Sequence, residues 1–271
     1  MKHGPVGVFF VDLDGTLVGR NGIAERVWAP LMALREAGWR LALCTGRPGR
    51  GIAMEVARRI DPDGLHVFES GGAVLDTTGR VVRQAPIALQ GVQAIADVSR
   101  AEAAVLECYS AEGRYLVLEK EAYVLAHEKL LGFEAEVSAD WPPQVPLVRL
   151  QWVVPSTRWP SLRDSASGVL TQVSSHEGRS PLVPGVSFVS ITAPDVSKAT
   201  GMAAVLEHYG LSPASSAMAG DNHNDLEGLR FVGAAFVPAD GADAAKSLAH
   251  HLIPSADLGG VADAAAILLS R

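Results

Sequence analysis

Residues 6–69 alternate short apolar runs with segments of helical spacing, and this alternation constrains the fold more than any other feature. The run at 6–11 has the character of a strand that is buried on both faces, as in parallel sheets. Apolar side chains then recur at three- and four-residue spacing (Val27, Leu31 and Leu34), which predicts an amphipathic helix.

The same pattern is repeated directly afterwards. Residues 40–44 form a second predicted strand, a helix is predicted around Ile52, Val56 and Ile60, and residues 66–69 form a third predicted strand. Strand, helix, strand, helix, strand is typical of a doubly wound, parallel α/β core. Such sheets bind ligands beyond the carboxyl ends of their strands.

The rhythm changes between about Pro86 and Pro184, where strand-like runs are separated by polar and proline-rich connections. The predicted strands of this region are 104–109, 115–118, 147–154 and 169–173. We interpret residues 86–189 as an inserted α+β cap domain, and residues 1–85 and 190–271 as the two halves of the core.

The core pattern resumes after the insertion. A helix is predicted from Ala199 to Tyr209, with Ser197 at its start, and strands are predicted at 214–219 and 234–237.

Four short polar segments lie at the ends of predicted strands or the starts of predicted helices. In chain order they are Asp12 to Thr16, Thr45-Gly46-Arg47, Lys198, and Gly220 to Asp225. Each alone is a weak signal, and their order and placement together point to one phosphoryl-transfer site.

The carboxylates of these segments suit the chemistry of phosphate esters. Asp12 and Asp14 can both point into one cleft from a tight loop, so that one attacks phosphorus and the other transfers protons. Asp221 and Asp225 add two more negative charges, and each like-charged pair at 4 Å costs about 4 kcal/mol at an effective dielectric constant near 20. A cluster of this kind needs a cation, and all-oxygen ligands that share a phosphate suit Mg²⁺.

These motifs resemble those of the haloacid dehalogenase-like (HAD) phosphatase superfamily, and in particular its Cof-type members with a class IIB cap. The resemblance extends from Val6 to about Ala266. It implies that Asp12 is the nucleophile and Asp14 the general acid and base. It also implies that Mg²⁺ is held by the Asp12 carboxylate, the Asp14 backbone carbonyl and Asp221, with Asp225 as an indirect or water-mediated partner.

The resemblance further implies which residues hold the substrate phosphate: Thr45, Gly46, Lys198 and Asn224, with Arg47 nearby. One departure is visible, because the family often has glycine directly after the lysine, where this chain has Ala199. We expect this departure to alter only the local packing.

Composition limits the classes of partner. A net charge of −7 and an isoelectric point near 5.6 argue against a nucleic-acid-binding surface, which needs clustered lysine and arginine. No stretch approaches the ~18 apolar residues of a membrane span. We therefore expect a cytoplasmic protein without a membrane partner, whose two cysteines, Cys44 and Cys108, are buried thiols.

The same motifs leave three functions open. The first is a phosphatase acting on small phosphorylated metabolites, for which the resemblance suggests sugar phosphates, pyridoxal phosphate or flavin mononucleotide. The second is a phosphomutase, which returns the phosphoryl group to a sugar. The third is a non-catalytic protein that binds a phosphometabolite, which the presence of both Asp12 and Asp14 argues against. The sequence leaves the oligomeric state open.

The residues of the cap that contact the substrate are harder to predict. The polar candidates near predicted strand ends are Arg149, His176, Glu177 and Arg179, and for each of them an ordinary surface position is the simpler interpretation. Three tryptophans, at 141, 152 and 159, are interpreted as core or interface side chains.

Overall fold

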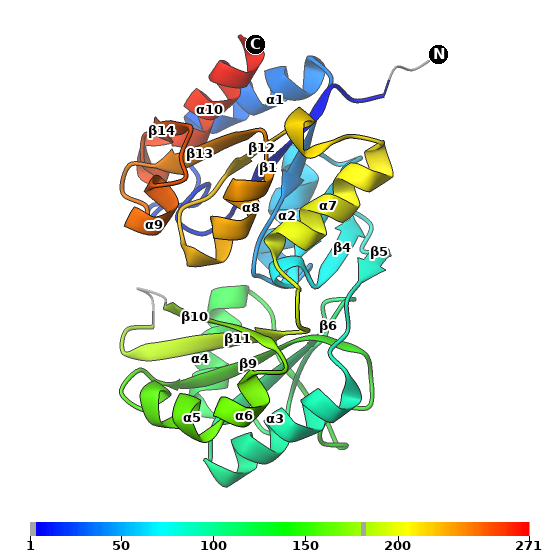
Figure 1. Ribbon diagram of the computed structural model, residues 1–271, viewed down its shortest axis with the longest axis vertical. Helices are drawn as coiled ribbons and strands as arrows, with labels where there is room; N and C mark the ends of the chain where they lie inside the picture. Colours follow the sequence, from blue (N-terminus) through cyan, green and yellow to red (C-terminus); the bar gives the residue numbers. More distant parts are fainter. Residues whose placement is uncertain (1–3, 180–182, 271) are drawn as a thin grey trace.

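The structure, a computed structural model, describes residues 4–179 and 183–270 and contains two bodies, one above the other in Figure 1. The upper body is built on a five-stranded parallel sheet of order β14-β13-β12-β1-β2. Its strands are β1 (Gly7–Val11), β2 (Trp39–Leu43), β12 (Ser216–Ala219), β13 (Ala234–Pro238) and β14 (His251–Ile253). The predicted α/β class with a parallel core is confirmed.

Helices cover both faces of this sheet, because β1, an inner strand between β12 and β2, is apolar on both sides. Phe9 and Val11 of β1 pack into one hydrophobic cluster, and Val8 and Phe10 pack into another. The first cluster lies under α1 (Trp28–Glu36), α2 (Gly51–Ile60) and α10 (Gly260–Leu269). The second lies under α7 (Lys198–Tyr209), α8 (Leu226–Phe231) and α9 (Asp243–Lys246).

The third predicted strand lies outside the five-stranded sheet, which corrects the prediction. β3 (Leu65–Phe68) pairs antiparallel with β4 (Ala73–Asp76), which pairs with β5 (Val81–Gln84). A single parallel bridge between Cys44 and Val67 joins it to the end of β2. At this bridge β3 runs parallel to the chain at the end of β2, as expected. However, β3 forms its ladder of hydrogen bonds with β4 and not with β2.

The lower body is built on a six-stranded sheet of order β10-β11-β9-β6-β7-β8. Its strands are β6 (Val105–Ser110), β7 (Tyr115–Val117), β8 (Glu136–Val137), β9 (Leu147–Pro155), β10 (Ser174–Arg179) and β11 (Val186–Thr192). One face packs against α3 (Leu89–Ala101), α5 (Trp159–Ser165) and α6 (Ser167–Leu170), and the other against α4 (Ala122–Leu131). The boundaries at 85/86 and 189/190 stay predictions, and β11 extends past the second of them.

The predicted strand at 169–173 is wrong, because α6 and a turn occupy these residues. Val169, Leu170 and Val173 all pack against the same hydrophobic cluster. A strand would send alternate side chains to opposite faces, whereas a helical turn places these three on one face. The strand of this region begins at the next residue, as β10.

The expectations for the cysteines and tryptophans are confirmed. Cys44 and Cys108 are buried free thiols. Trp152 is fully buried and Trp159 nearly so, while Trp141 packs at the edge of the same cluster. Within the described residues, no helix is long and apolar enough to cross a membrane.

Candidate active site

Three neighbouring strands of the parallel sheet end at one edge and deliver polar residues there. Asp12 follows β1, Thr45 comes just after β2, and Asp221 follows β12 and Gly220. The Asp12 amide donates a hydrogen bond to the Ala219 carbonyl, 2.9 Å away, which ties the loop after β1 to the end of β12. Parallel strands place their carboxyl ends together, so the topology itself creates this cluster.

A buried lysine lies between two of the aspartates. Lys198, the first residue of α7, donates from Nζ to Oδ1 of Asp12 and to Oδ1 of Asp225, each 2.6 Å away. All three side chains are buried, and Lys198 is only 1% exposed. Asp225 also accepts hydrogen bonds from the amides of Asp221 and Asn222, so it fixes the loop as well as the lysine.

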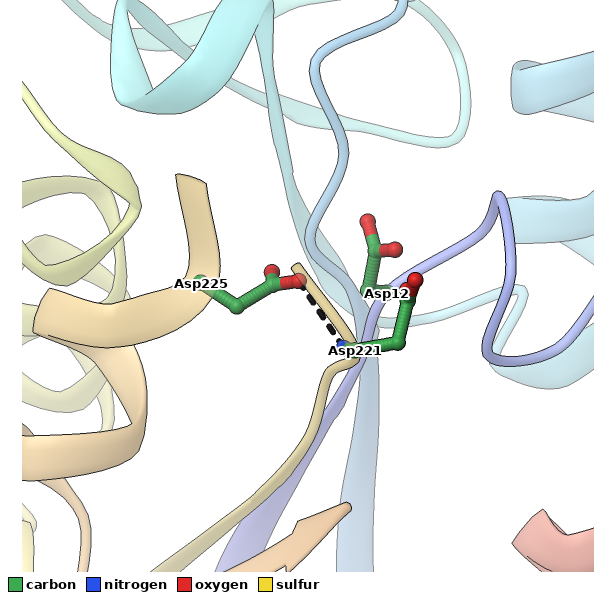
Figure 2. Close-up of side chains that lie close together, drawn as sticks. All are labelled: Asp12, Asp221 and Asp225. Carbon is green, nitrogen blue, oxygen red and sulfur yellow. Dashed lines mark hydrogen bonds between the residues drawn. The ribbon is translucent and has the colours of Figure 1, made fainter. Parts of the chain in front are cut away.

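The carboxylates of Asp12, Asp221 and Asp225 form a group that could hold a metal ion. One oxygen from each lies within 4.8 Å of the others, and Figure 2 shows that they gather from separate segments of the chain. Thr16 donates a hydrogen bond of 2.9 Å to Asp221, which orients that carboxylate. Thr16 is not among the predicted site residues, although it directly follows the Asp-x-Asp-Gly turn.

Two glycines make room for this cluster. A side chain at Gly15, which has φ +88°, would place its Cβ 2.5 Å from an Asp221 oxygen, and one at Gly220 would lie 2.7 Å from the Asp225 carboxyl carbon. Such distances are shorter than van der Waals contact, so any larger residue would displace an aspartate.

The charges of the cluster do not balance by themselves. Burial raises the pKa of the Asp12 carboxyl well above its usual range, against the attraction of Lys198 and with the repulsion of Asp225 and Asp221. Burial, followed by the charge of Asp225, raises the pKa of Asp221 to about 6. Three carboxylates share one ammonium group, and a divalent cation with oxygen ligands fits this donor set.

Asp14 lies apart from these carboxylates in a different arrangement. Its two oxygens accept hydrogen bonds from Nε and Nη2 of Arg47, at 2.8 and 2.6 Å, in a two-pronged ion pair. The Asp14 side chain is 53% exposed. Arg47 also donates from Nη1 to the carbonyl of Leu130 at the end of α4, so it joins the Asp14 loop to the lower body.

The Thr45 segment is held by its own turn and by the loop after β3. The Thr45 hydroxyl accepts a hydrogen bond from the Arg47 amide, and the Thr45 carbonyl accepts one from the Ser70 amide. A side chain at Gly46 would approach the Ser70 hydroxyl to 3.2 Å. Phosphate-binding loops commonly need such open backbone.

A cavity of about 250 Å³ opens beside the buried lysine, between the upper body and strand β10. Asn224, the last predicted phosphate-binding residue, lies on its wall with the cap candidate His176. Its lining includes Ser70, His176, Ser197, Lys198, His223 and Asn224.

The other cap candidates have different surroundings. Arg149 is 2% exposed and forms an ion pair with Glu69, so the expectation of an ordinary surface position is wrong for this residue. Glu177 accepts a hydrogen bond from the Ser187 hydroxyl within the six-stranded sheet. The side chain of Arg179 lies outside the part of the chain that is described.

Solved structures of similar fold were found across nearly the whole chain. A haloacid dehalogenase-like hydrolase from Bacteroides thetaiotaomicron is 20% identical and has a TM-score of 0.83, covering 97% of this chain and 99% of that one. A sugar phosphatase of HAD subclass IIB is 19% identical and has a TM-score of 0.79, covering 97% of this chain and 98% of that one. A protein from Thermotoga maritima is 16% identical and has a TM-score of 0.80, covering 96% of this chain and 97% of that one.

A curated relative, the chloroplastic endoribonuclease YBEY of Arabidopsis thaliana, is 25% identical over 94% of this chain. The chain spans only 45% of that protein's length. A sequence model of the haloacid dehalogenase-like hydrolases matches residues 9–264, which include all four polar segments. The resemblance drawn from the motifs is thereby confirmed, and the chain belongs to the haloacid dehalogenase-like hydrolase family.

Proposed function

We propose that this protein is a Mg²⁺-dependent phosphatase that hydrolyses small phosphorylated metabolites, such as sugar phosphates, through an aspartyl-phosphate. One observation carries the proposal: Asp12 is buried against Lys198 at the sheet edge, beside Asp221 and Asp225. A carboxylate can attack a phosphate only if it reaches the phosphorus atom and if the negative charges of both groups are offset. Lys198 and a bound cation would together offset these charges around Asp12.

In the proposed reaction, an oxygen of Asp12 forms a bond to phosphorus while the ester bond to the leaving oxygen breaks. Asp14 donates a proton to that oxygen and later accepts one from the water that hydrolyses the aspartyl-phosphate. Lys198 lies 2.6 Å from Asp12, where its charge offsets the negative charge that gathers around phosphorus. Arg47 forms an ion pair with Asp14 in this structure. Its guanidinium can instead bind the phosphate of a substrate, because the phosphate is an anion like the Asp14 carboxylate.

A bound Mg²⁺ would be held by the Asp12 carboxylate, the Asp14 carbonyl and Asp221, with Asp225 as an indirect or water-mediated partner. The ion would neutralise negative charge on the phosphate oxygens. We further propose that residues 86–189 act as a cap that shields the reaction from water. The Arg47–Leu130 contact, which joins the catalytic loop to that region, supports this proposal.

The test is the release of inorganic phosphate from a panel of phosphorylated metabolites, with Mg²⁺ and with a chelator. We expect release that the chelator abolishes, and we expect Asp12→Asn to lower it at least about a thousandfold while the melting temperature is retained. Asp164→Asn, at an exposed position of α5, is the matched control and should behave like the wild type.

Three results would contradict the proposal. Asp12→Asn with more than about a tenth of normal activity would remove Asp12 as nucleophile. Isomerised phosphosugar without free phosphate would identify a mutase instead, and no reaction with any compound in a folded sample would favour a binding protein.

A further inference from the structure

The turn after β3 has an unfavourable backbone at two residues with side chains. Glu69 has φ 52° and Ser70 has φ 56°, both in the left-handed region. Residues other than glycine rarely adopt this conformation, and those that do are concentrated at functional sites. Neither residue belongs to the four polar segments, so the function proposed above does not account for the turn.

This turn contacts two of the phosphate-binding segments of the proposed site, Thr45-Gly46-Arg47 and the start of the Lys198 helix. The amide of Glu69 donates to the Arg47 carbonyl and that of Ser70 donates to the Thr45 carbonyl, each at 3.1 Å. On the other side, Gly71 lies so close to the N-terminus of α7 that an added Cβ would be 1.9 Å from the Ser197 carbonyl. The position of the turn therefore sets the positions of Thr45, Arg47 and the start of the Lys198 helix.

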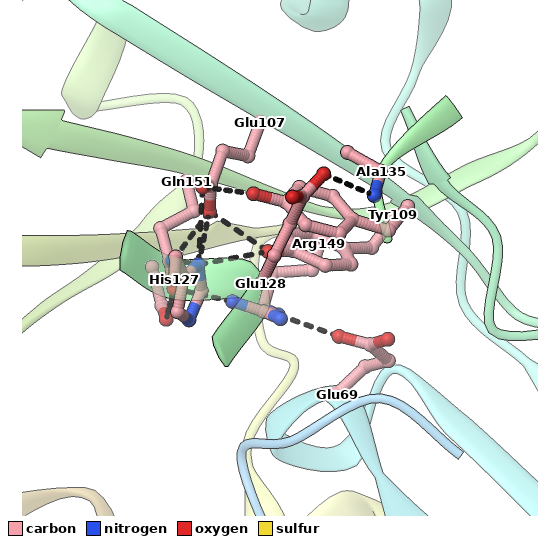
Figure 3. Close-up of polar contacts among 10 residues, drawn as sticks. Glu69, Glu107, Tyr109, His127, Glu128, Ala135, Arg149 and Gln151 are labelled. Atoms are coloured by element: carbon pink, nitrogen blue, oxygen red, sulfur yellow. Dashed lines mark hydrogen bonds and ion pairs between the residues drawn. The ribbon is translucent and has the colours of Figure 1, made fainter. Parts of the chain in front are cut away.

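The side chain of Glu69 connects the turn to the lower body. It is 0% exposed and accepts a hydrogen bond from Nε of Arg149, which belongs to β9 (Figure 3). The second oxygen, Oε1, is buried and accepts no hydrogen bond from any described residue. An unsatisfied buried carboxylate oxygen costs free energy, so a contact that served stability alone is not expected to contain one, and its presence calls for a functional explanation.

Arg149 is fixed by a polar network inside the lower body. Its guanidinium lies 3.9 Å from the centre of the Tyr109 ring and donates to the Gln151 side chain. Gln151 in turn donates to Glu107, a buried carboxylate that also contacts His127 at 2.8 Å. Figure 3 shows these groups side by side on the α4 side of the sheet. The guanidinium therefore has little freedom to move relative to β9.

Arg149 also lies where the chain passes between the two bodies. It pairs with Thr192, the last residue of β11, and Lys198 follows six residues later. The other passage runs beside it, because the Ile87 amide donates to the Leu147 carbonyl. A contact beside both connections moves least when one body rotates against the other, as expected of a pivot.

We propose that Glu69 and Arg149 are positioning residues: their ion pair is the pivot on which the cap turns, and it holds the Glu69–Gly71 turn that sets the phosphate-binding residues. The proposal rests on the phosphatase function proposed above. In that reaction, neither the Glu69 nor the Arg149 side chain touches the reacting atoms. They act through Thr45, Arg47 and Lys198, so their contribution is the same for every leaving group.

The test compares Glu69→Gln, Arg149→Met and the double variant with the wild type. Glu134→Gln is the control, because it removes an exposed ion pair with Lys120 inside the lower body. Turnover is measured with a sugar phosphate and with p-nitrophenyl phosphate, which differ in leaving group. Hydrogen exchange of residues 45–47 and 193–198 is measured without substrate.

We expect each single variant to lower kcat by about tenfold or more, by the same factor for both substrates. The double variant should be no worse than the singles, because the two residues act as one unit. Exchange at 45–47 and 193–198 should accelerate in all three, and Glu134→Gln should resemble the wild type.

Two outcomes would overturn the proposal. A loss of kcat that differs between the two substrates would show that the pair recognises the leaving group. A lower melting temperature with unchanged kcat and unchanged exchange would make it a structural contact only. If the wild type releases no phosphate at all, the proposed function fails, and the exchange measurement still decides whether the pair positions these segments.

Discussion

The ammonium group of Lys198 is placed between Asp12 and Asp225, and the three charges depend on one another. Removing one partner of a buried ion pair leaves the other charge without compensation, which typically costs about 3–5 kcal/mol. We expect Lys198→Met to lower the free energy of unfolding by about this amount in chelator, and to abolish turnover. Chemical denaturation measures the first effect and phosphate release the second.

Lys246→Met provides the control for the lysine prediction. Lys246 pairs with Asp243 on the surface of α9, at 2.8 Å, and solvent screens that pair. Its replacement should leave both stability and turnover almost unchanged. Equal and small losses in the two variants would show that the charges around Lys198 are not coupled as described.

His66 is a second buried group whose ionisation affects stability. Its Nδ1 accepts a hydrogen bond from the Leu43 amide, and its Nε2 donates to the Asp61 carbonyl, both at 3.0 Å. Burial lowers the pKa of His66 to about 4. The folded protein therefore favours the neutral ring, while the unfolded chain takes up a proton near pH 6.5. Stability from this group is full above about pH 6.5 and is lost as the pH falls towards about 4.

The expected loss at His66 is about 2 kcal/mol between about pH 7 and about pH 5. The measurement is the free energy of unfolding at both pH values for the wild type and for His66→Gln, which lacks the titrating ring. The difference between the two pH values should shrink by this amount in the variant. His208→Gln, at an exposed position of α7, should retain the wild-type difference, and a full difference in His66→Gln would contradict the assignment.

At the scale of elements, the close approach of the turn after β3 to α7 can be tested with two glycines. Gly71 and Gly79 have similar backbone angles, φ +102° and +90°, so alanine is strained at both. Only Gly71 has a neighbour in the way, because an added Cβ there would meet Ser197, whereas nothing lies within 4 Å at Gly79. The comparison therefore separates backbone strain from collision.

We expect Gly79→Ala to cost about 1–2 kcal/mol, from left-handed strain alone. Gly71→Ala should cost about 1–3 kcal/mol more, because α7 must move away. It should also lower phosphate release, since Lys198 is the first residue of that helix. Denaturation and turnover of the two variants measure these effects, and equal losses would show that the contact with Ser197 does not constrain the helix.

The elements that could be predicted are those whose burial is visible in the local pattern. β1, β2, β12 and β13 are apolar runs bounded by polar turns, and their predicted ranges differ from the observed ones by one or two residues. The strand predicted at 169–173 was wrong, because a short apolar run fits a half-buried helical turn as well as a strand. The placement of β3 failed because strand partners are chosen by tertiary packing, which local sequence does not record.

The candidate site shows the same division. The motif residues Asp12, Thr45, Lys198 and Asp221 could be placed because each is tied to a strand end or a helix start. Glu69 and Arg149 are separated by 80 residues and belong to different bodies. Each looks like a surface residue when its partner is unknown, so only the folded structure could reveal the pair.

At the scale of the whole molecule, the two bodies have separate hydrophobic clusters, and the acidic group belongs to the upper one. A ligand that binds only the folded state stabilises it by about 2.7 kcal/mol at a concentration one hundred times its Kd. We expect Mg²⁺ at such a concentration to raise the melting temperature by about 5 °C or more, at constant ionic strength. Calorimetry in Mg²⁺ and in chelator measures this change without any substrate.

Asp221→Asn separates specific binding from a general effect of salt. In chelator this variant should be at least as stable as the wild type, because it removes a carboxylate whose pKa is raised to about 6 by burial and by the charge of Asp225. In Mg²⁺ it should lose most of the rise in melting temperature, since one carboxylate ligand is gone. Asp164→Asn should keep the full rise. An undiminished rise in Asp221→Asn would place the ion elsewhere on this acidic molecule, and the carboxylate cluster would then need another explanation.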